Sequence, residues 1–168
     1  MLDLAIKHAD QLQEKMLSTW FDDKYKYFHY SNWYSNEKIV KDDTWNQHQF
    51  ISVNTAGEVI GFISYEIRRA ENYACALAAI NFSDQKISFG RDLGQCIRDI
   101  FEKFKFEKLK FSVVIGNPIE HTYDTLIEKY GGRIVGTFQK DVKLIDGEYY
   151  DSKFYELTRE NYLKNIKI

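Results

Sequence analysis

The sequence contains little proline and little cysteine. Pro118 is the one proline in 168 residues, where an average usage of about 5% would give roughly eight. No Gly/Ser-rich or Pro-rich joint and no internal repeat marks a boundary, so we expect one domain over residues 1–168. Cys75 and Cys96 are too few for a disulfide framework and lack CxxC spacing. We therefore expect two buried, reduced thiols.

Long apolar runs and an excess of one charge are also missing. No apolar segment approaches the roughly 18 residues of a membrane span, and residues 1–15 lack the basic-then-apolar order of a signal peptide. These absences predict a soluble, cytoplasmic protein with no membrane partner. Lys and Arg number 23 against 25 Asp and Glu, a net charge of -2, so no global positive field would attract nucleic acid. The four histidines (His8, His29, His48, His121) lack metal-ligand spacing, and no metal is assigned.

Apolar periodicity predicts a chain in which strands and helices alternate. Residues 2–6 suit a short strand or the first turn of the following helix, and residues 21–46 suit a loop with a short helix. The predicted elements are a strand at 2–6, a helix at 9–20, strands at 50–53, 59–67 and 73–82, a helix at 89–104, a strand at 109–115, a helix at 117–130 and strands at 134–145 and 149–158.

Several local patterns refine these elements. Asn117 followed by Pro118 predicts a helix start, with Asn as the cap and Pro at the first helical position. Gly131-Gly132 predicts the end of that helix, and Asp146-Gly147 predicts a hairpin turn. The continuous apolar run at 73–82 predicts a strand covered on both faces. Strand, helix and strand from 73 to 115 imply two parallel neighbours in one sheet.

This order, with three local features, resembles the GNAT acetyltransferase superfamily over nearly the full length. The features are an apolar strand, LAAINF, that enters a helix through residues 88–92, a strand that ends at Asn117 before a helix, and Gly131-Gly132 followed by a hairpin with Asp151 in its second arm. The resemblance implies an α+β (α/β) fold: a mixed, mostly antiparallel central sheet with a splayed parallel strand pair, flanking helices and a C-terminal hairpin. It also implies acetyl-CoA as the donor and an amine acceptor on a small molecule or protein. A homodimer is left open.

The donor site that the resemblance implies has a physical basis, because a helix N-terminus offers unpaired N–H groups and a positive dipole end to a pyrophosphate. Gly90 would let the phosphate approach the backbone, while Lys86 and Arg91 add positive charge; alternatively, Gly90 is a turn residue and Ser88 only a cap. The strand ending at 80–82 would present backbone groups to the pantetheine amides. Asn117 would bond the donor or only cap its own helix. The candidate donor-site residues are Ile80, Asn81, Phe82, Lys86, Ser88, Phe89, Gly90, Arg91, Asp92, Leu93 and Asn117.

The phosphate loop departs from the family pattern, which expects Arg or Gln, two residues, Gly, one residue, then Gly or Ala. Around Gly90 the first and last places hold Ile87 and Asp92. A second register starting at Arg91 would put Gly94 inside the apolar helical stripe, so the register of Gly90 is preferred. An inward-pointing Asp92 would repel a phosphate.

Acetyl transfer needs a deprotonated amine, a polarised thioester carbonyl and a proton for the departing thiolate. The resemblance implies that a tyrosine of the last helix gives this proton, but the family position falls on Ile127. Tyr123 lies one turn earlier on the same face and is the catalytic candidate; alternatively it packs between helix and sheet. No general base is evident, because carboxylates near strand ends (Glu66, Glu71, Asp84) are usually solvated.

The resemblance implies that the aromatic-rich segment from Trp20 to Trp45 shapes the acceptor site; its rings include Tyr25, Tyr27, Phe28, His29, Tyr30, Trp33 and Tyr34. Tyr30, Trp33 and Tyr34 are the acceptor-site candidates together with Glu66. Aromatic walls suit an amine on an apolar or cationic body; alternatively these rings complete the core. The predicted function is an acetyl-CoA-dependent N-acetyltransferase. The alternative is a binding or regulatory domain of the same fold that has lost efficient catalysis, and a nucleic-acid binder would need a basic groove that the charge balance does not supply.

Overall fold

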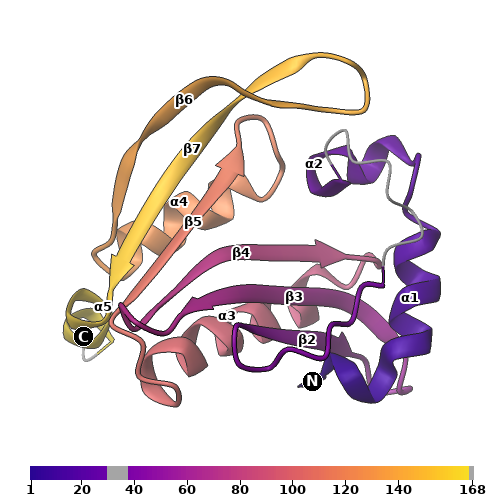
Figure 1. The fold of residues 1–168 in the computed structure, drawn as a ribbon, viewed down its shortest axis with the longest axis horizontal. Coiled ribbons are helices and arrows are strands. Elements are labelled where there is room, and N and C mark those ends of the chain that lie inside the picture. The colour runs from indigo at the N-terminus through magenta and orange to yellow at the C-terminus, as the bar shows by residue number, and fades with distance from the viewer. Residues whose placement is uncertain (30–37, 167–168) are drawn as a thin grey trace.

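One seven-stranded sheet organises the chain in the structure, a computed structural model that describes residues 1–29 and 38–166 (Figure 1). The strand order is β1-β2-β3-β4-β5-β7-β6. The strands are β1 (Leu2–Leu4), β2 (Gln47–Val53), β3 (Val59–Arg68), β4 (Tyr73–Asn81), β5 (Lys108–Val114), β6 (Arg133–Lys143) and β7 (Tyr149–Thr158). The helices are α1 (Ala9–Leu17), α2 (Lys26–His29), α3 (Lys86–Glu102), α4 (Glu120–Lys129) and α5 (Arg159–Asn165), with 3-10 turns at Ala5–His8 and Asp23–Tyr25.

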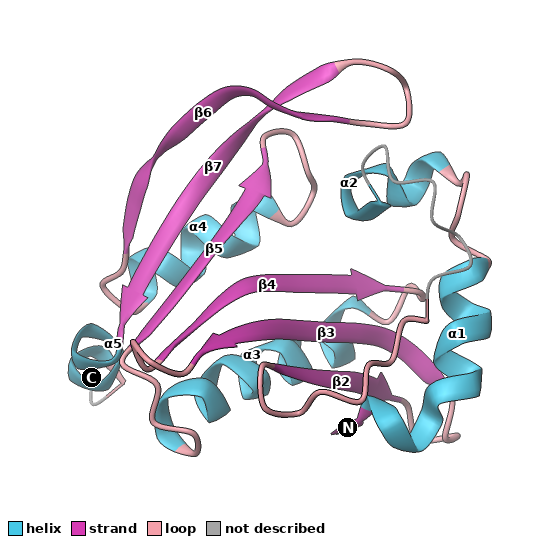
Figure 2. Ribbon diagram, viewed as in Figure 1, coloured by secondary structure: helices cyan, strands magenta, loops and turns pink. Residues whose placement is uncertain are grey.

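Neighbouring strands are antiparallel except for β4 and β5, which are parallel as predicted. The two parallel strands pair at three positions only, from Tyr73↔Lys108 to Cys75↔Lys110. Beyond Cys75 they diverge, and the sheet opens into a V whose arms are β4 and β5 (Figure 2). The mixed, mostly antiparallel sheet with a splayed parallel pair is thereby confirmed.

Two apolar clusters cover opposite faces of the β1–β4 part of the sheet. Phe50 and Ile63 pack with α3 on one face, and their chain neighbours Ile51 and Phe62 pack with α1 on the other. This alternation is the period-two pattern of a strand buried on both faces.

Glycine is needed at position 61 because the ring of Phe89 crosses the backbone there. A Cβ on Gly61 would lie 2.3 Å from Phe89 Cε2, far inside van der Waals contact. The close approach of α3 to β3 holds Phe89, a residue of the first turns of α3, at the open end of the V.

Three sequence predictions need correction. The last long helix begins at Glu120, not at Asn117; Asn117 instead forms a turn, its side-chain oxygen accepting a hydrogen bond from the backbone N–H of Ile119 (3.1 Å). Strand β4 is covered on both faces only in part: Leu77 and Ile80 pack in the two opposite apolar clusters, but Ala76 is exposed and Ala78 is half-buried, because β5 stops pairing with this strand after Cys75. Helix α5, capped by the Thr158 hydroxyl, was not predicted, since the apolar pattern ends with the preceding strand.

The expectations for the end of α4, for the hairpin turn and for Cys96 are borne out. Gly131, with φ +68°, ends α4, and Asp146-Gly147 forms the turn between β6 and β7. Both cysteines are free thiols; Cys96 is buried as expected, but Cys75 is half-buried. No helix of the described chain is long and apolar enough to cross a membrane. Among residues 1–29 and 38–166, no group of three His, Cys, Asp or Glu side chains could hold a metal ion.

Candidate functional site

A pocket of about 550 Å³ lies in the opening of the V, within the size range of small-molecule and cofactor sites. Four parts of the chain form its walls: β4 from Leu77 to Asn81, the start of α3, the end of β5 with the turn into α4, and α2. The pocket therefore exists because β4 and β5 stop pairing after three positions.

The start of α3 supplies the polar end of the pocket. Its first turn carries N–H groups without intrahelical partners, and the preceding residue, Gln85, makes no side-chain capping bond. Lys86 is exposed and lines the pocket beside Gly90. A Cβ at Gly90 would meet no atom within 4 Å, so an anion has room to approach the helix backbone there.

Strand β4 presents an open backbone edge to the pocket. Its other edge pairs with β3, from Gly61↔Asn81 to Arg68↔Tyr73, and a bulge places both Ala76 and Leu77 opposite Tyr65. Ala76 has φ +53°, the left-handed conformation in which a bulge commonly holds its extra residue. Backbone groups past the bulge are thus positioned to receive an extended ligand as an added strand.

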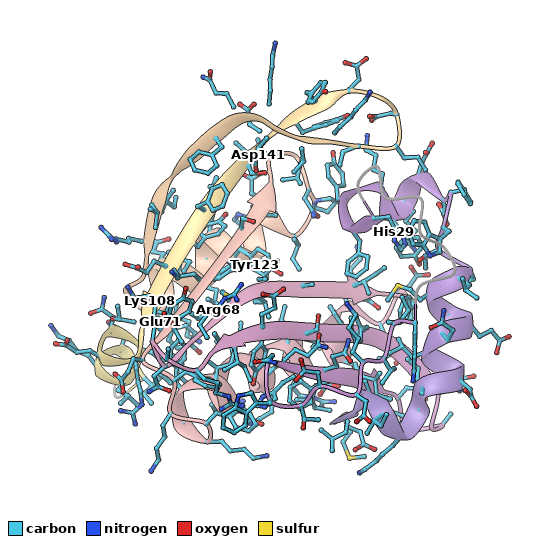
Figure 3. All side chains as sticks on the ribbon, in the orientation of Figure 1. His29, Arg68, Glu71, Lys108, Tyr123 and Asp141 are labelled. Carbon is cyan, nitrogen blue, oxygen red and sulfur yellow. The ribbon has the colours of Figure 1, made fainter. Side chains whose placement is uncertain are left out.

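Tyr123, the catalytic candidate on α4, has its side chain in the opening between β4 and β5 (Figure 3). It is 3% exposed and packs edge-on against Phe111, with ring centroids 4.9 Å apart. Glu71 lies elsewhere, at the narrow end of the V near Lys108. Of the carboxylates considered as bases, Asp84 lines the pocket and Glu66 and Glu71 do not.

A charged network holds α4 against β7. Lys153 of β7 forms ion pairs with Glu120 and with Asp124 (3.0 Å), and the Tyr155 hydroxyl donates a hydrogen bond to Asp124 (2.7 Å). The pKa of Asp124 is lowered by the Tyr155 hydroxyl and then by Lys153. Glu120 also accepts from the backbone N–H of Gly116 (2.9 Å). These contacts fix the turn and the first turns of α4 that carry Tyr123.

Helix α2 closes the opposite side of the pocket. Tyr27 and Phe28 line it, and the Tyr27 hydroxyl reaches the turn after β5, where a Cβ on Gly116 would lie 3.3 Å from it. Lys26 contacts the β6–β7 turn, with its ammonium 2.9 Å from Asp146. Tyr25, Tyr27 and Phe28 belong to the aromatic segment expected to shape the acceptor site, and all three line the pocket. Lys24 also lines it and was not predicted.

The structure brings together most of the residues predicted for the donor site. They come from β4, α3 and the turn before α4: Ile80, Asn81, Lys86, Phe89, Gly90, Leu93 and Asn117 all line the pocket, together with the catalytic candidate Tyr123. The register built on Gly90 agrees with this placement, since α3 continues through Gly94 to Glu102.

Four other predicted donor residues lie outside the lining. Phe82 packs in the core cluster on the α1 side, and its N–H donates to the carbonyl of Ile60 (2.8 Å). Ser88 is half-buried and Arg91 is exposed. Asp92 is buried and points away from the pocket: its carboxylate accepts from the Ser52 hydroxyl (2.6 Å) and lies 2.9 Å from the α-amino group of Met1. The Asp92 carboxylate would therefore not face a phosphate bound in the pocket.

The predicted acceptor residues are placed only in part. Glu66 is exposed on β3, directly opposite Cys75, and pairs with Arg68 at 3.1 Å. It does not line the pocket, because β3 lies one strand away from the V. Tyr30, Trp33 and Tyr34 lie outside the described residues.

Comparison with known proteins identifies the architecture. No protein-family profile matches the sequence, and no curated protein matches it. Solved structures do match. A chimera of the spermidine N-acetyltransferase from Vibrio cholerae and its human counterpart aligns with a TM-score of 0.71 at 20% identity, over 98% of this chain and 99% of that chain. The chain has the GNAT acetyltransferase fold.

Two further structures agree with this assignment. A point mutant of the Vibrio cholerae spermidine N-acetyltransferase aligns with a TM-score of 0.68 at 19% identity, over 97% of each chain. A protein described as a probable acetyltransferase aligns with a TM-score of 0.70 at 16% identity, over 95% of this chain and 92% of that chain. These alignments show that the chain shares the fold of these proteins over almost its whole length.

Proposed function

We propose that the chain is an acetyl-CoA-dependent N-acetyltransferase that moves an acetyl group to a primary amine of a small molecule or protein. The observation that carries this proposal is the pocket in the V, which joins a helix N-terminus, an open strand edge and a buried tyrosine in one space. Structures with the same fold are spermidine N-acetyltransferases, which favours an amine as acceptor.

In this proposal each wall of the pocket has one task. The pyrophosphate lies at the start of α3, where free N–H groups, the helix dipole and Lys86 favour negative charge. The pantetheine amides pair with the open edge of β4 past Ala76. The thioester then reaches the bulge, where the backbone N–H of the extra residue polarises the carbonyl.

The chemical step is the attack of the neutral amine on the thioester carbonyl carbon. The C–N bond forms, the C–S bond breaks, and the amine loses a proton to solvent. Tyr123 gives its hydroxyl proton to the departing CoA thiolate and is re-protonated from water. By the reference pKa values, about 10 for a phenol and about 8.5 for a thiol, this proton transfer is slightly uphill, so the position of the hydroxyl beside the sulfur matters more than its acidity.

A cytoplasmic setting fits the two free cysteines, because disulfides form in oxidising compartments. The function is tested by following CoA release from acetyl-CoA in the presence of a panel of primary amines, with mass spectrometry of the product. Acetylated amine formed in step with free CoA is the expected result. Donor binding without turnover on any amine would favour a binding or regulatory domain, and neither binding nor turnover would refute the proposal.

A further inference from the structure

The ammonium group of Lys26 sits in a cage at the mouth of the pocket. Its Nζ lies 2.9 Å from Asp146 Oδ2 and donates to the Tyr150 hydroxyl at 3.3 Å. The same nitrogen lies 5.3 Å from the ring centroids of Tyr27 and Tyr150. We call Asp146, Tyr150 and Tyr27 the ammonium cage.

Contacts that do not involve Lys26 also hold the cage together. The Tyr150 hydroxyl donates to Asp146 Oδ2 at 2.7 Å, and the backbone N–H of Glu148 donates to Asp146 Oδ1 at 3.0 Å. The rings of Tyr27 and Tyr150 meet edge to face, 6.1 Å apart. A carboxylate, a hydroxyl and two aromatic faces around one point are the groups that bind an alkylammonium ion.

The ammonium cage lies next to the pocket. Tyr27 lines the pocket on one side and the cage on the other, and the β6–β7 turn arches toward α2 across the mouth of the V (Figure 1). Any ligand in the cage therefore borders the pocket. The pKa of Asp146 is lowered to about 2, first by the Tyr150 hydroxyl and then by Lys26, so the carboxylate is charged at neutral pH.

We propose that the ammonium cage is a subsite for a second cationic group of the acceptor, and that Lys26 occupies this subsite in the free protein as an internal competitor. The inference rests on the proposed function and specifies its acceptor as a diamine or polyamine: one ammonium fills the cage while a second, neutral amine reaches the thioester. Lys26 has a long flexible stem on a four-residue helix, so it can swing out to solvent and leave its place to a like charge.

Competition by Lys26 has a measurable consequence. When a site is free only a fraction of the time, the apparent affinity for its ligand falls to that fraction of the intrinsic affinity. If Lys26 fills the cage about nine-tenths of the time, the substitution Lys26→Met, which keeps the apolar stem, should tighten diamine binding roughly tenfold. A monoamine of equal length has no second ammonium, so its binding should not change.

The experiment is calorimetric titration of 1,4-diaminobutane and of butylamine into the wild-type protein, Lys26→Met, Asp146→Asn and Lys129→Met. Lys129 is the matched control, because it also lies over a tyrosine ring, that of Tyr130, but does not line the pocket. We expect tighter diamine binding for Lys26→Met, at least tenfold weaker binding for Asp146→Asn, and no change for Lys129→Met. Equal or weaker diamine binding by Lys26→Met would overturn the proposal, as would the same change for butylamine.

This titration needs no acetyl transfer, so it separates two failures. Diamine binding that responds as expected, without any acetylated product, would refute the acetyltransferase function and leave the cage in place. Acetyl transfer with the same diamine KM in Lys26→Met and the wild type would refute the role of the cage as an acceptor subsite, while the acetyltransferase function would stand. In folded, active variants the two readouts together decide both questions.

Discussion

Adding a single methyl group at position 61 should disturb both the stability and the pocket. In Gly61→Ala the new Cβ would lie 2.3 Å from Phe89 Cε2 and 2.9 Å from the carbonyl oxygen of Ile80. Phe89 is 6% exposed and the carbonyl belongs to the β4 backbone, so neither atom can move without disturbing packed structure. Overpacking of this kind costs about 1–3 kcal/mol.

Urea unfolding of the variant measures this loss, and Gly94→Ala is its control. A Cβ at Gly94 meets no atom within 4 Å, and the residue lies inside α3, where replacing Gly by Ala stabilises a helix by about 0.5–1 kcal/mol. Glycine-to-alanine substitution should therefore lower the free energy of unfolding at position 61 and raise it at position 94. Because Phe89 also lines the pocket, Gly61→Ala should weaken acetyl-CoA binding as well. A free energy of unfolding within about 0.5 kcal/mol of wild type, the usual range of a harmless surface change, would refute this reasoning.

Three further predictions test other parts of the structure. Tyr123→Phe should lower kcat by roughly 10²-fold, the lower range for general acid catalysis, with donor affinity unchanged by calorimetry; unchanged kcat would rule out Tyr123 as the acid. Tyr155→Phe should destabilise by about 1 kcal/mol at pH 7. Since the pKa of Asp124 is lowered in the folded protein, the stability that its ionised form contributes is present above the ordinary pKa of about 4 and is lost as the pH falls from there through the lowered pKa. The difference in the free energy of unfolding between Tyr155→Phe and wild type should therefore be smaller at pH 3 than at pH 7; an equal difference at both pH values would contradict this prediction. Gly131→Ala, at φ +68°, should cost about 1–2 kcal/mol in thermal unfolding, and an unchanged Tm would contradict the strained turn.

Much of the fold could be predicted because local patterns and tertiary packing agree. The apolar stripe of α3, from Phe89 to Phe101, becomes the buried face of that helix, and Asp146-Gly147 forms its hairpin turn. Where two local structures compete, the sequence is ambiguous. Asn117-Pro118 suits a helix cap, but the same asparagine oxygen can close a turn on Ile119, and α4 starts only after that turn.

The site was harder to predict because its walls meet only in three dimensions. The apolar run of β4 gives no sign that its small residues face an opening, since that depends on where pairing with β5 stops. Asp92 lies in the phosphate-loop pattern, yet its direction is set by Ser52, 40 residues earlier. The contact of Lys26 with Asp146 joins residues 120 positions apart, and no local pattern records it.

The most direct test of the donor site is titration calorimetry of acetyl-CoA and CoA into the wild-type protein, Gly90→Glu and Gly94→Glu. Both glycines lie in α3 with open space beside them, but only Gly90 lines the pocket. We predict that the wild type and Gly94→Glu bind both ligands alike and that Gly90→Glu, which places a negative charge where the pyrophosphate should lie, binds neither. No binding to the wild type, or equal binding by Gly90→Glu, would contradict a donor site in the V.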